Sequence, residues 1–263
     1  MNASALLLDV DGVLIQGNAA VPEATKALQA LADHRVPFRL VTNTSQRSRA
    51  TLARRLNAFG FAVAPSIILT PAVAAARYLR ERGGTAYLAT RADVKDDFAD
   101  VGIVSDDGRP DVVILGDLAE DLTYAEINRI LRFLLDGAEL AALGRTRYWQ
   151  APSGPAIDVG PVAALFEEAA GIQARVFGKP DSAIFDEAAR SLGVGADALA
   201  MVGDDAEVDV AAAKRAGLGA GFLIQTGKYR SGDEHRHAPA PDAVYPTFAA
   251  FVAALTMGSK SSP

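Results

Sequence analysis

Cysteine is absent from the 263-residue sequence. This absence excludes disulfide bonds and thiolate metal sites and fits a reducing compartment, so we predict a cytoplasmic protein. No stretch reaches the ~20 consecutive apolar residues of a membrane-spanning helix, and the apolar run at residues 5–15 is interrupted by Asp9 and Asp11. We therefore expect neither a membrane span nor a signal peptide.

Positive charge is scarce too, since 26 Lys and Arg stand against 32 Asp and Glu, for a net charge of -6. Nucleic-acid binding needs clustered basic residues, so we exclude nucleic acid as a partner. No Gly-x-Gly-x-x-Gly follows the first apolar run, which argues against a dinucleotide-binding enzyme. The remaining profile, 50% hydrophobic and 22% charged, predicts a globular protein of one large or two modest domains.

Short apolar runs of strand length alternate with longer segments of helical period. This alternation is typical of a parallel sheet with helices on both faces, so we predict an α/β protein. Strands are expected at residues 5–10, 38–42, 86–89, 112–115, 199–202 and 221–224. Helices are expected at residues 22–33, 46–59, 71–82, 123–135, 161–170, 181–192 and 207–216.

The first predicted strand ends in two acids, Asp9 and Asp11, followed by Gly12. Ligands of doubly wound sheets bind beyond the carboxyl ends of the strands, so both carboxylates should project toward a crevice. Gly12 would let a ligand approach the backbone closely.

The second predicted strand runs into hydroxyl and amide side chains, Thr42 to Ser45. Such groups can bind phosphoryl oxygens, but Thr44 or Ser45 would equally suit the N-cap of the following helix. Further along, Lys179 stands between turn residues just before a helix and can place a positive charge in a cleft.

A fourth segment, residues 203–209, places several acids between a strand and a helix. Acids at a helix N-terminus complement the helix dipole, which accounts for Asp205 and Glu207 without any function. Asp204 together with Asp9 would supply two carboxylate ligands of the kind that Mg²⁺ prefers.

These four segments match, in order and spacing, the motifs of the haloacid dehalogenase superfamily, and the resemblance covers nearly the whole chain. Residues 153–160 and 226–229 are similar to the subgroup with phospholysine phosphohistidine inorganic pyrophosphate phosphatase. The resemblance implies a type IIA, C2-capped phosphatase. Its Rossmann-like, doubly wound core would comprise residues 1–70 and 175–263, with an α/β cap inserted at 71–174.

The resemblance also implies Mg²⁺-dependent hydrolysis of small phosphorylated metabolites. Asp9 would attack phosphorus and form an aspartyl phosphate, and Asp11 would act as the general acid and then the general base. Lys179 would be catalytic and would also bind substrate, as would Thr42 and Asn43.

For the metal, the resemblance implies Mg²⁺ bound by Asp9, Asp204 and the backbone carbonyl of Asp11. Asp205 and Asp209 would not bind the metal themselves but would stabilise the positions of its ligands. Animal members of the nearest subgroup carry Ser at the position of Asp11. An acid there favours cleavage of phosphomonoesters, because it can protonate an alkoxide leaving group.

Several alternatives stay open at this point. A phosphotransferase or phosphomutase of the same superfamily would pass the phosphoryl group to a sugar hydroxyl, and a receiver-like module would be phosphorylated without turnover. Residues 147–154 are a candidate substrate loop, but Tyr148 and Trp149 equally suit the cap core or a dimer contact. A homodimer formed through the cap is the expectation for the family.

Overall fold

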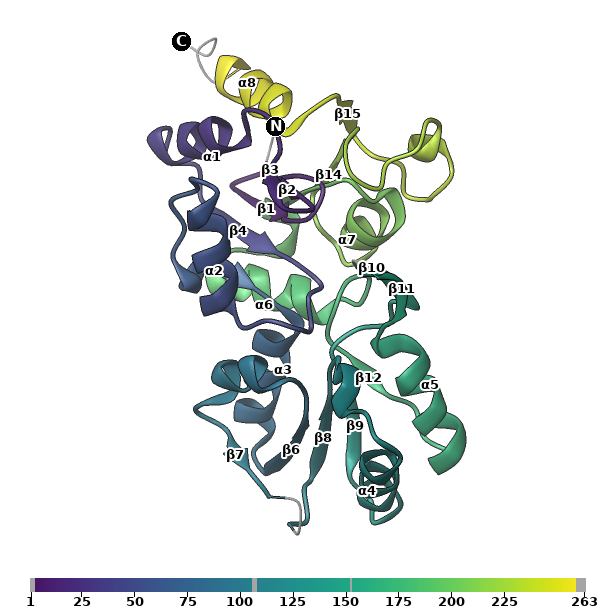
Figure 1. Cartoon of the computed structure of the whole chain (residues 1–263). Helices are drawn as coiled ribbons and strands as arrows, with labels where there is room; N and C mark the ends of the chain where they lie inside the picture. The colour runs from purple at the N-terminus through teal and green to yellow at the C-terminus, as the bar shows by residue number, and fades with distance from the viewer. Residues whose placement is uncertain (1–2, 106–107, 152, 259–263) are drawn as a thin grey trace. The chain divides into compact units, whose positions relative to one another are not determined.

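The computed structural model describes residues 3–105, 108–151 and 153–258, which form two compact units. Unit 1 consists of Met1–Thr42, Leu52–Leu69 and Lys179–Pro263. Unit 2 consists of Asn43–Thr51 and Thr70–Gly178. Each unit is built around its own parallel sheet (Figure 1).

Unit 1 contains a six-stranded parallel sheet in the order β15-β14-β13-β1-β4-β5. The strands are β1 (Ala5–Asp9), β4 (Phe38–Val41), β5 (Ile68–Leu69), β13 (Leu199–Gly203), β14 (Ala220–Ile224) and β15 (Ala243–Tyr245). The chain leaves β1 toward β4 and β5, and later returns to the other side of β1 through β13. The boundary between β1 and β13 is therefore the switch point of this sheet, the place where ligands of such folds bind.

Helices cover both faces of this sheet. On one face α1 (Ala24–Asp33), α2 (Arg49–Ala58) and α8 (Phe248–Gly258) pack on the side of Leu6, Leu8 and Leu40. The π-helical segment η5 (Ala206–Ala211) contacts β13 and β14 on the opposite face. Helix α6 (Ala183–Leu192) packs on β4 and β5. The remaining elements of unit 1 are α7 (Ala212–Arg215), η1 (Pro65–Ile67), η4 (Ala196–Ala198), η6 (Asp233–His235) and the hairpin of β2 (Ile15–Gln16) and β3 (Ala19–Ala20).

The helix predicted at residues 46–59 begins at Arg49, and its cap is neither Thr44 nor Ser45. The hydroxyl of Ser48 accepts a hydrogen bond from the backbone N–H of Thr51 at 3.3 Å, as an N-cap residue does. Thr44 and Ser45 therefore lie in the connection between strand and helix.

Unit 2 contains a five-stranded parallel sheet in the order β12-β9-β8-β6-β7. The strands are β6 (Thr85–Ala89), β7 (Gly102–Ile103), β8 (Val112–Leu115), β9 (Glu139–Ala142) and β12 (Arg175–Val176). The other elements are α3 (Pro71–Arg82), α4 (Tyr124–Leu135), α5 (Val159–Ala170), η2 (Ala92–Phe98), η3 (Ala119–Asp121) and the antiparallel hairpin of β10 (Tyr148–Ala151) and β11 (Gly154–Ile157).

The core of unit 2 forms where α4 and α5 pack on one face of the sheet through Phe133 and Phe166. The N-cap of α3 is Thr70, whose hydroxyl accepts a hydrogen bond from the backbone N–H of Val73. Residues 175–176 belong to this sheet because β12 pairs with β9. The predicted cap, residues 71–174, ends just before β12, and those bounds stay a prediction.

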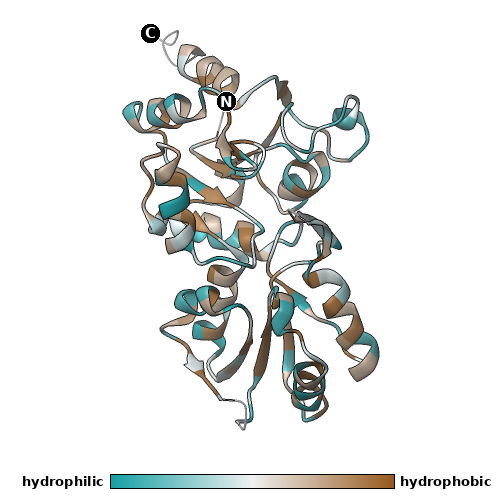
Figure 2. Ribbon diagram, viewed as in Figure 1, coloured by the Kyte–Doolittle hydropathy of each residue, from teal (hydrophilic) through white to brown (hydrophobic). Residues whose placement is uncertain are grey.

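The fold class predicted from the sequence is confirmed: the chain combines a doubly wound, Rossmann-like sheet with a second α/β unit inserted between β5 and α6. Figure 2 shows mostly hydrophobic strands in both sheets, with hydrophilic residues gathered on helices and loops. In the part of the chain that the structure describes, no helix is both long and apolar enough to cross a membrane.

Candidate active site

The candidate site lies at the carboxyl edge of the unit 1 sheet, where four neighbouring strands end. Asp9 is the last residue of β1, Thr42 follows β4, Asp204 follows β13, and Thr226 lies two residues beyond β14. Parallel strands bring their carboxyl ends to one edge, so these residues gather there although more than 200 residues separate Asp9 from Thr226.

Three carboxylates meet at this edge. Asp9, Asp204 and Asp209 are buried, and each contributes an oxygen that lies within 4.8 Å of the others. Burial, with Asp9 and Asp209 close by, raises the pKa of Asp204 to about 8. Burial also raises the pKa of Asp209 to about 6 and that of Asp9 above its usual value, although Lys179 opposes both shifts.

Lys179 is the buried cation of the cluster. Its Nζ lies 2.6 Å from Asp9 Oδ1 and 2.7 Å from Asp209 Oδ1, and it donates a hydrogen bond to the carbonyl of Val41 at 3.3 Å. Burial lowers the pKa of this ammonium group, but Asp209 and Asp9 raise it by more, so the net shift is upward. Lys179 therefore stays protonated and holds Asp9 and Asp209 in place.

The donor set suits a hard divalent cation. The three buried carboxylates have one buried ammonium group beside them, and it pairs with Asp9 and Asp209. With all three carboxyls ionised, these four groups would carry an excess of two negative charges. Buried charge of this kind is unfavourable unless a counter-ion compensates for it. Carboxylate oxygens are the ligands that Mg²⁺ and Ca²⁺ take, so the residues present fit such an ion.

A turn after β14 positions Asp204. The backbone N–H of Lys228 donates to Asp204 Oδ2 at 2.6 Å, and the Thr226 hydroxyl donates to the carbonyl of Gly12 at 2.5 Å. A Cβ atom on Gly12 or Gly227 would overlap the Asp204 carboxylate, and both glycines have positive φ. Thr226 and Lys228 were not among the predicted site residues, although a hydroxyl and a lysine just after a buried strand were a visible signal.

Asp205 and Asp209 behave differently from each other. The Asp205 carboxylate caps η5, since it accepts hydrogen bonds from the backbone N–H groups of Glu207 and Val208 at 3.1 and 2.9 Å. Asp209 accepts a hydrogen bond from the backbone N–H of Asp205 at 3.2 Å and pairs with Lys179. Asp205 is thus the N-cap of η5, and Asp209 belongs to the buried cluster. The supporting role predicted for both residues stays a prediction.

Asp11 is exposed, two residues beyond Asp9. Thr42 is buried, and its backbone N–H donates to the carbonyl of Leu69 at 3.1 Å. Asn43, the next residue, is half-buried and groups with unit 2. The roles of these three residues stay predictions.

The predicted substrate loop at residues 147–154 forms most of the β10–β11 hairpin, apart from Pro152, which lies outside the described residues. Tyr148 is 59% exposed, so it is not part of the core of unit 2. Trp149 is half-buried.

Two family models match this sequence, one in its N-terminal part and one in its C-terminal part. The model described as haloacid dehalogenase-like hydrolase matches residues 6–104, and a second model for the same type of hydrolase matches residues 176–251. The first match contains Asp9 and the second contains Lys179, Asp204 and Asp209.

Three known proteins are similar over most of their length. Human phospholysine phosphohistidine inorganic pyrophosphate phosphatase is 36% identical over 236 residues, 88% of this chain and 86% of that protein. Bovine haloacid dehalogenase-like hydrolase domain-containing protein 2 is 37% identical over 237 residues, 90% of each. The structure of p-nitrophenyl phosphatase from Archaeoglobus fulgidus superposes with a TM-score of 0.88 at 28% identity and covers 96% of this chain and 99% of that one. The chain is therefore a phosphatase that belongs to the haloacid dehalogenase-like hydrolase family, with a Rossmann-like core and a cap domain.

Proposed function

We propose that the protein hydrolyses small phosphate esters in a Mg²⁺-dependent reaction, through an aspartyl phosphate formed on Asp9. The observation that carries the proposal is the position of Asp9. Its carboxylate ends the central strand at the switch point, buried between the ammonium group of Lys179 and two further acids.

In the first step one Asp9 oxygen attacks phosphorus, the bond to the ester oxygen breaks, and the phosphoryl group is transferred to Asp9. Lys179 binds Asp9 Oδ1 at 2.6 Å and so fixes the orientation of the carboxylate. Asp11, in its protonated form, donates its proton to the leaving alkoxide, which departs as an alcohol. Its exposure gives it access to the leaving group and to water.

In the second step water attacks the aspartyl phosphate and Asp11 accepts a proton from it, so that inorganic phosphate leaves and Asp9 is regenerated. Asp9, Asp204 and the backbone carbonyl of Asp11 would hold Mg²⁺. When bound, the cation offsets the repulsion between the Asp9 carboxylate and the anionic substrate. Lys179, Thr42 and Asn43 would bind the phosphoryl oxygens.

The substrate class follows from the chemistry of the site and from the relatives. One relative is named for phospholysine, phosphohistidine and pyrophosphate, and another for p-nitrophenyl phosphate. The acid at Asp11 suits alkoxide leaving groups, so we propose phosphate monoesters as the main substrates. We further propose a cytoplasmic enzyme without a nucleic-acid or membrane partner, assembled as a homodimer through the cap.

The test measures phosphate release from p-nitrophenyl phosphate, glycerol phosphate, pyrophosphate and phosphohistidine, with Mg²⁺ or with EDTA. Asp9→Asn should lower turnover at least ~1,000-fold, as loss of a nucleophile does. Asp197→Asn is the matched control, because this exposed acid precedes β13 at the opposite edge of the same sheet. Turnover by Asp9→Asn near the wild-type rate would rule out the nucleophile.

A further inference from the structure

Lys228 lies in the turn after β14, and its side chain reaches solvent. Its backbone N–H donates to Asp204 Oδ2 at 2.6 Å, and the Thr226 hydroxyl fixes the same turn on the carbonyl of Gly12. The Lys228 side chain is nevertheless 69% exposed. The backbone of this residue is therefore fixed beside the carboxylate cluster of unit 1, whereas its ammonium group is accessible to a ligand.

The ammonium group of Lys228 is only loosely paired. Its Nζ lies 3.6 Å from Asp205 Oδ2, which is too long for a hydrogen bond, and no closer acid pairs with it in residues 3–105, 108–151 and 153–258. The Asp205 carboxylate already accepts hydrogen bonds from two backbone N–H groups at the start of η5. An exposed ion pair of this length contributes little to stability, so Lys228 can exchange it for a ligand.

Lys179, the buried cation of the cluster, has its donors occupied. An ammonium group has three N–H donors. Those of Lys179 are taken by Asp9 Oδ1, Asp209 Oδ1 and the carbonyl of Val41. Lys179 can therefore contact a phosphoryl oxygen only by giving up one of these partners. Lys228 can do so by giving up only its loose ion pair with Asp205.

The substrate would bring further negative charge to an acidic cluster. A phosphate ester carries a charge of about -1.5 to -2 at neutral pH. It would meet the carboxylates of Asp9, Asp204 and Asp209, which have the ammonium group of Lys179 beside them. A second ammonium group next to Asp204 would lower the repulsion further, because the attraction between opposite charges grows as they approach each other.

We propose that the Lys228 ammonium group binds an oxygen of the phosphoryl group that Asp9 receives, as a second cation of the site alongside Lys179. The flexible four-carbon stem would carry the ammonium group from Asp205 to the substrate, while the anchored turn keeps Asp204 in place. This inference rests on the proposed phosphatase function and adds a substrate-binding residue to it.

The test measures the binding of inorganic phosphate, which is the expected product and needs no turnover. The rise in melting temperature with phosphate concentration, at constant ionic strength and with Mg²⁺ present, gives the affinity. Lys228→Met should weaken phosphate binding about 5- to 20-fold, the range of one charge-assisted hydrogen bond in a partly exposed position. Lys228→Arg keeps the charge and should retain most of the affinity.

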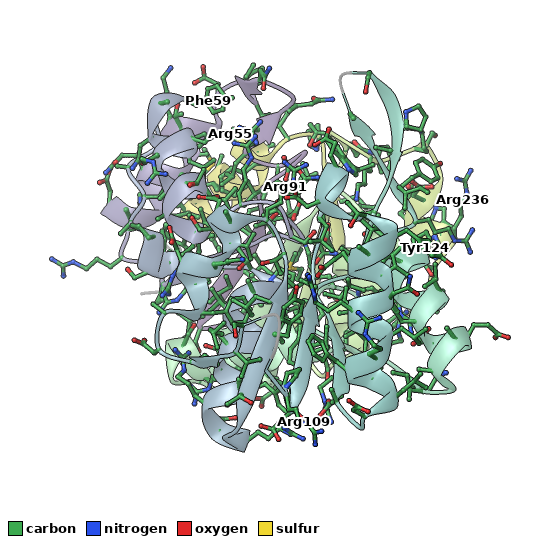
Figure 3. The ribbon with its side chains drawn as sticks, turned by 60° about the horizontal axis from the view of Figure 1, so that its bottom comes forward. Arg55, Phe59, Arg91, Arg109, Tyr124 and Arg236 are labelled. Atoms are coloured by element: carbon green, nitrogen blue, oxygen red, sulfur yellow. The ribbon has the colours of Figure 1, made fainter. Side chains whose placement is uncertain are left out.

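Arg236→Met is the matched control, because it removes one positive charge from the same connection between β14 and β15. Arg236 lies at the outer surface of the protein (Figure 3), and its side chain is 59% exposed and pairs with Asp233 at 2.7 Å. This variant should bind phosphate like the wild type. An equal loss of affinity in Arg236→Met and Lys228→Met would reduce the effect to net charge and overturn the proposal.

Mg²⁺ binding separates a substrate contact from a structural role. Loss of a positive charge near Asp204 should leave the affinity for Mg²⁺, measured without phosphate, unchanged or higher. A disturbed turn would lower that affinity, because the Lys228 backbone N–H holds Asp204. A fall in both affinities in Lys228→Met would therefore count against the proposal.

Phosphate binding also separates this inference from the proposed function. A phosphate affinity that depends on Lys228 supports the second cation even if the wild type hydrolyses none of the esters tested. Wild-type phosphate affinity in Lys228→Met, or no phosphate binding by the wild type, would overturn the second cation even if the ester hydrolysis assay succeeds.

Discussion

The ammonium group of Lys179 lies 2.7 Å from Asp209 Oδ1, nearly as close as it lies to Asp9. Asp209 is therefore a positioning residue for the lysine. Asp209→Asn should lower kcat by about 10- to 100-fold, because an amide holds the ammonium group less strongly than a carboxylate does. The effect should be smaller than that of Asp9→Asn, and steady-state kinetics beside an Asp186→Asn control would measure it. A kcat equal to that of the wild type would contradict this role.

Mg²⁺ should stabilise the protein through Asp204. An ion that binds only the folded state at 100 times its Kd adds about 2.7 kcal/mol of stability, which corresponds to a Tm increase of about 5 to 10 °C. Asp204→Asn should lose most of this increase, and EDTA should abolish it in the wild type. Asp197→Asn should respond to Mg²⁺ like the wild type. Thermal unfolding with and without Mg²⁺ measures this increase. If Mg²⁺ raised the Tm of Asp204→Asn as much as that of the wild type, Asp204 would not be a ligand.

Gly12→Ala should lower stability by more than the strain of placing alanine at a positive φ. Gly12 has φ of +97° and its added methyl group would overlap the Asp204 carboxylate. Gly137 has φ of +102° but no atom within 4 Å of an added methyl group. Gly137→Ala should therefore cost only the backbone strain, about 1–2 kcal/mol, whereas Gly12→Ala should lose stability, Mg²⁺ binding and turnover together. Similar behaviour of the two variants would show that the overlap has no consequence.

Glu167 should make the stability of unit 2 pH-dependent. The hydrogen bond from Arg145 lowers the pKa of the Glu167 carboxyl below its usual value, and the backbone N–H of Ala174 adds to the shift. An acid with a lowered pKa in the folded state stabilises the fold above its unfolded pKa and loses that contribution as the pH falls through its folded pKa.

Glu167→Gln should therefore unfold more easily at pH 7, by about 1–2 kcal/mol for a partly exposed pair. The difference from the wild type should shrink below about pH 4, where the wild-type carboxyl becomes protonated. Urea unfolding at pH 7 and pH 3.5 would measure it, and a difference that grows at the lower pH would have the wrong sign.

The predicted strands that are buried and four or more residues long are found within one residue of their expected ends. The strands β5 and β12 were not predicted, because two residues are too few to show the alternating hydrophobic pattern of a strand. β9 was missed because its Ala-rich run reads as a helix as easily as a strand. α8 was missed because it is apolar nearly all round, although Phe248 and Phe251 face the core while Met257 is 72% exposed.

The acids of the candidate site were predictable because each ends a buried strand or opens a helix. The ion pairs of Lys179 could not be predicted. Several acids lie near it in the predicted site, and side-chain packing determines that Asp9 and Asp209 are the two that contact it.

The division of unit 1 into three chain segments also bears on synthesis by the ribosome. β1 emerges early, but its neighbour β13 and the acids at its end are translated only after the whole of unit 2. Until then the nascent chain presents one exposed edge of β1, with its apolar face covered only in part. Unit 2 can fold during this interval, and the carboxylate cluster forms last. A chain that ends after unit 2 would therefore lack three strands of the unit 1 sheet together with Lys179, Asp204 and Asp209.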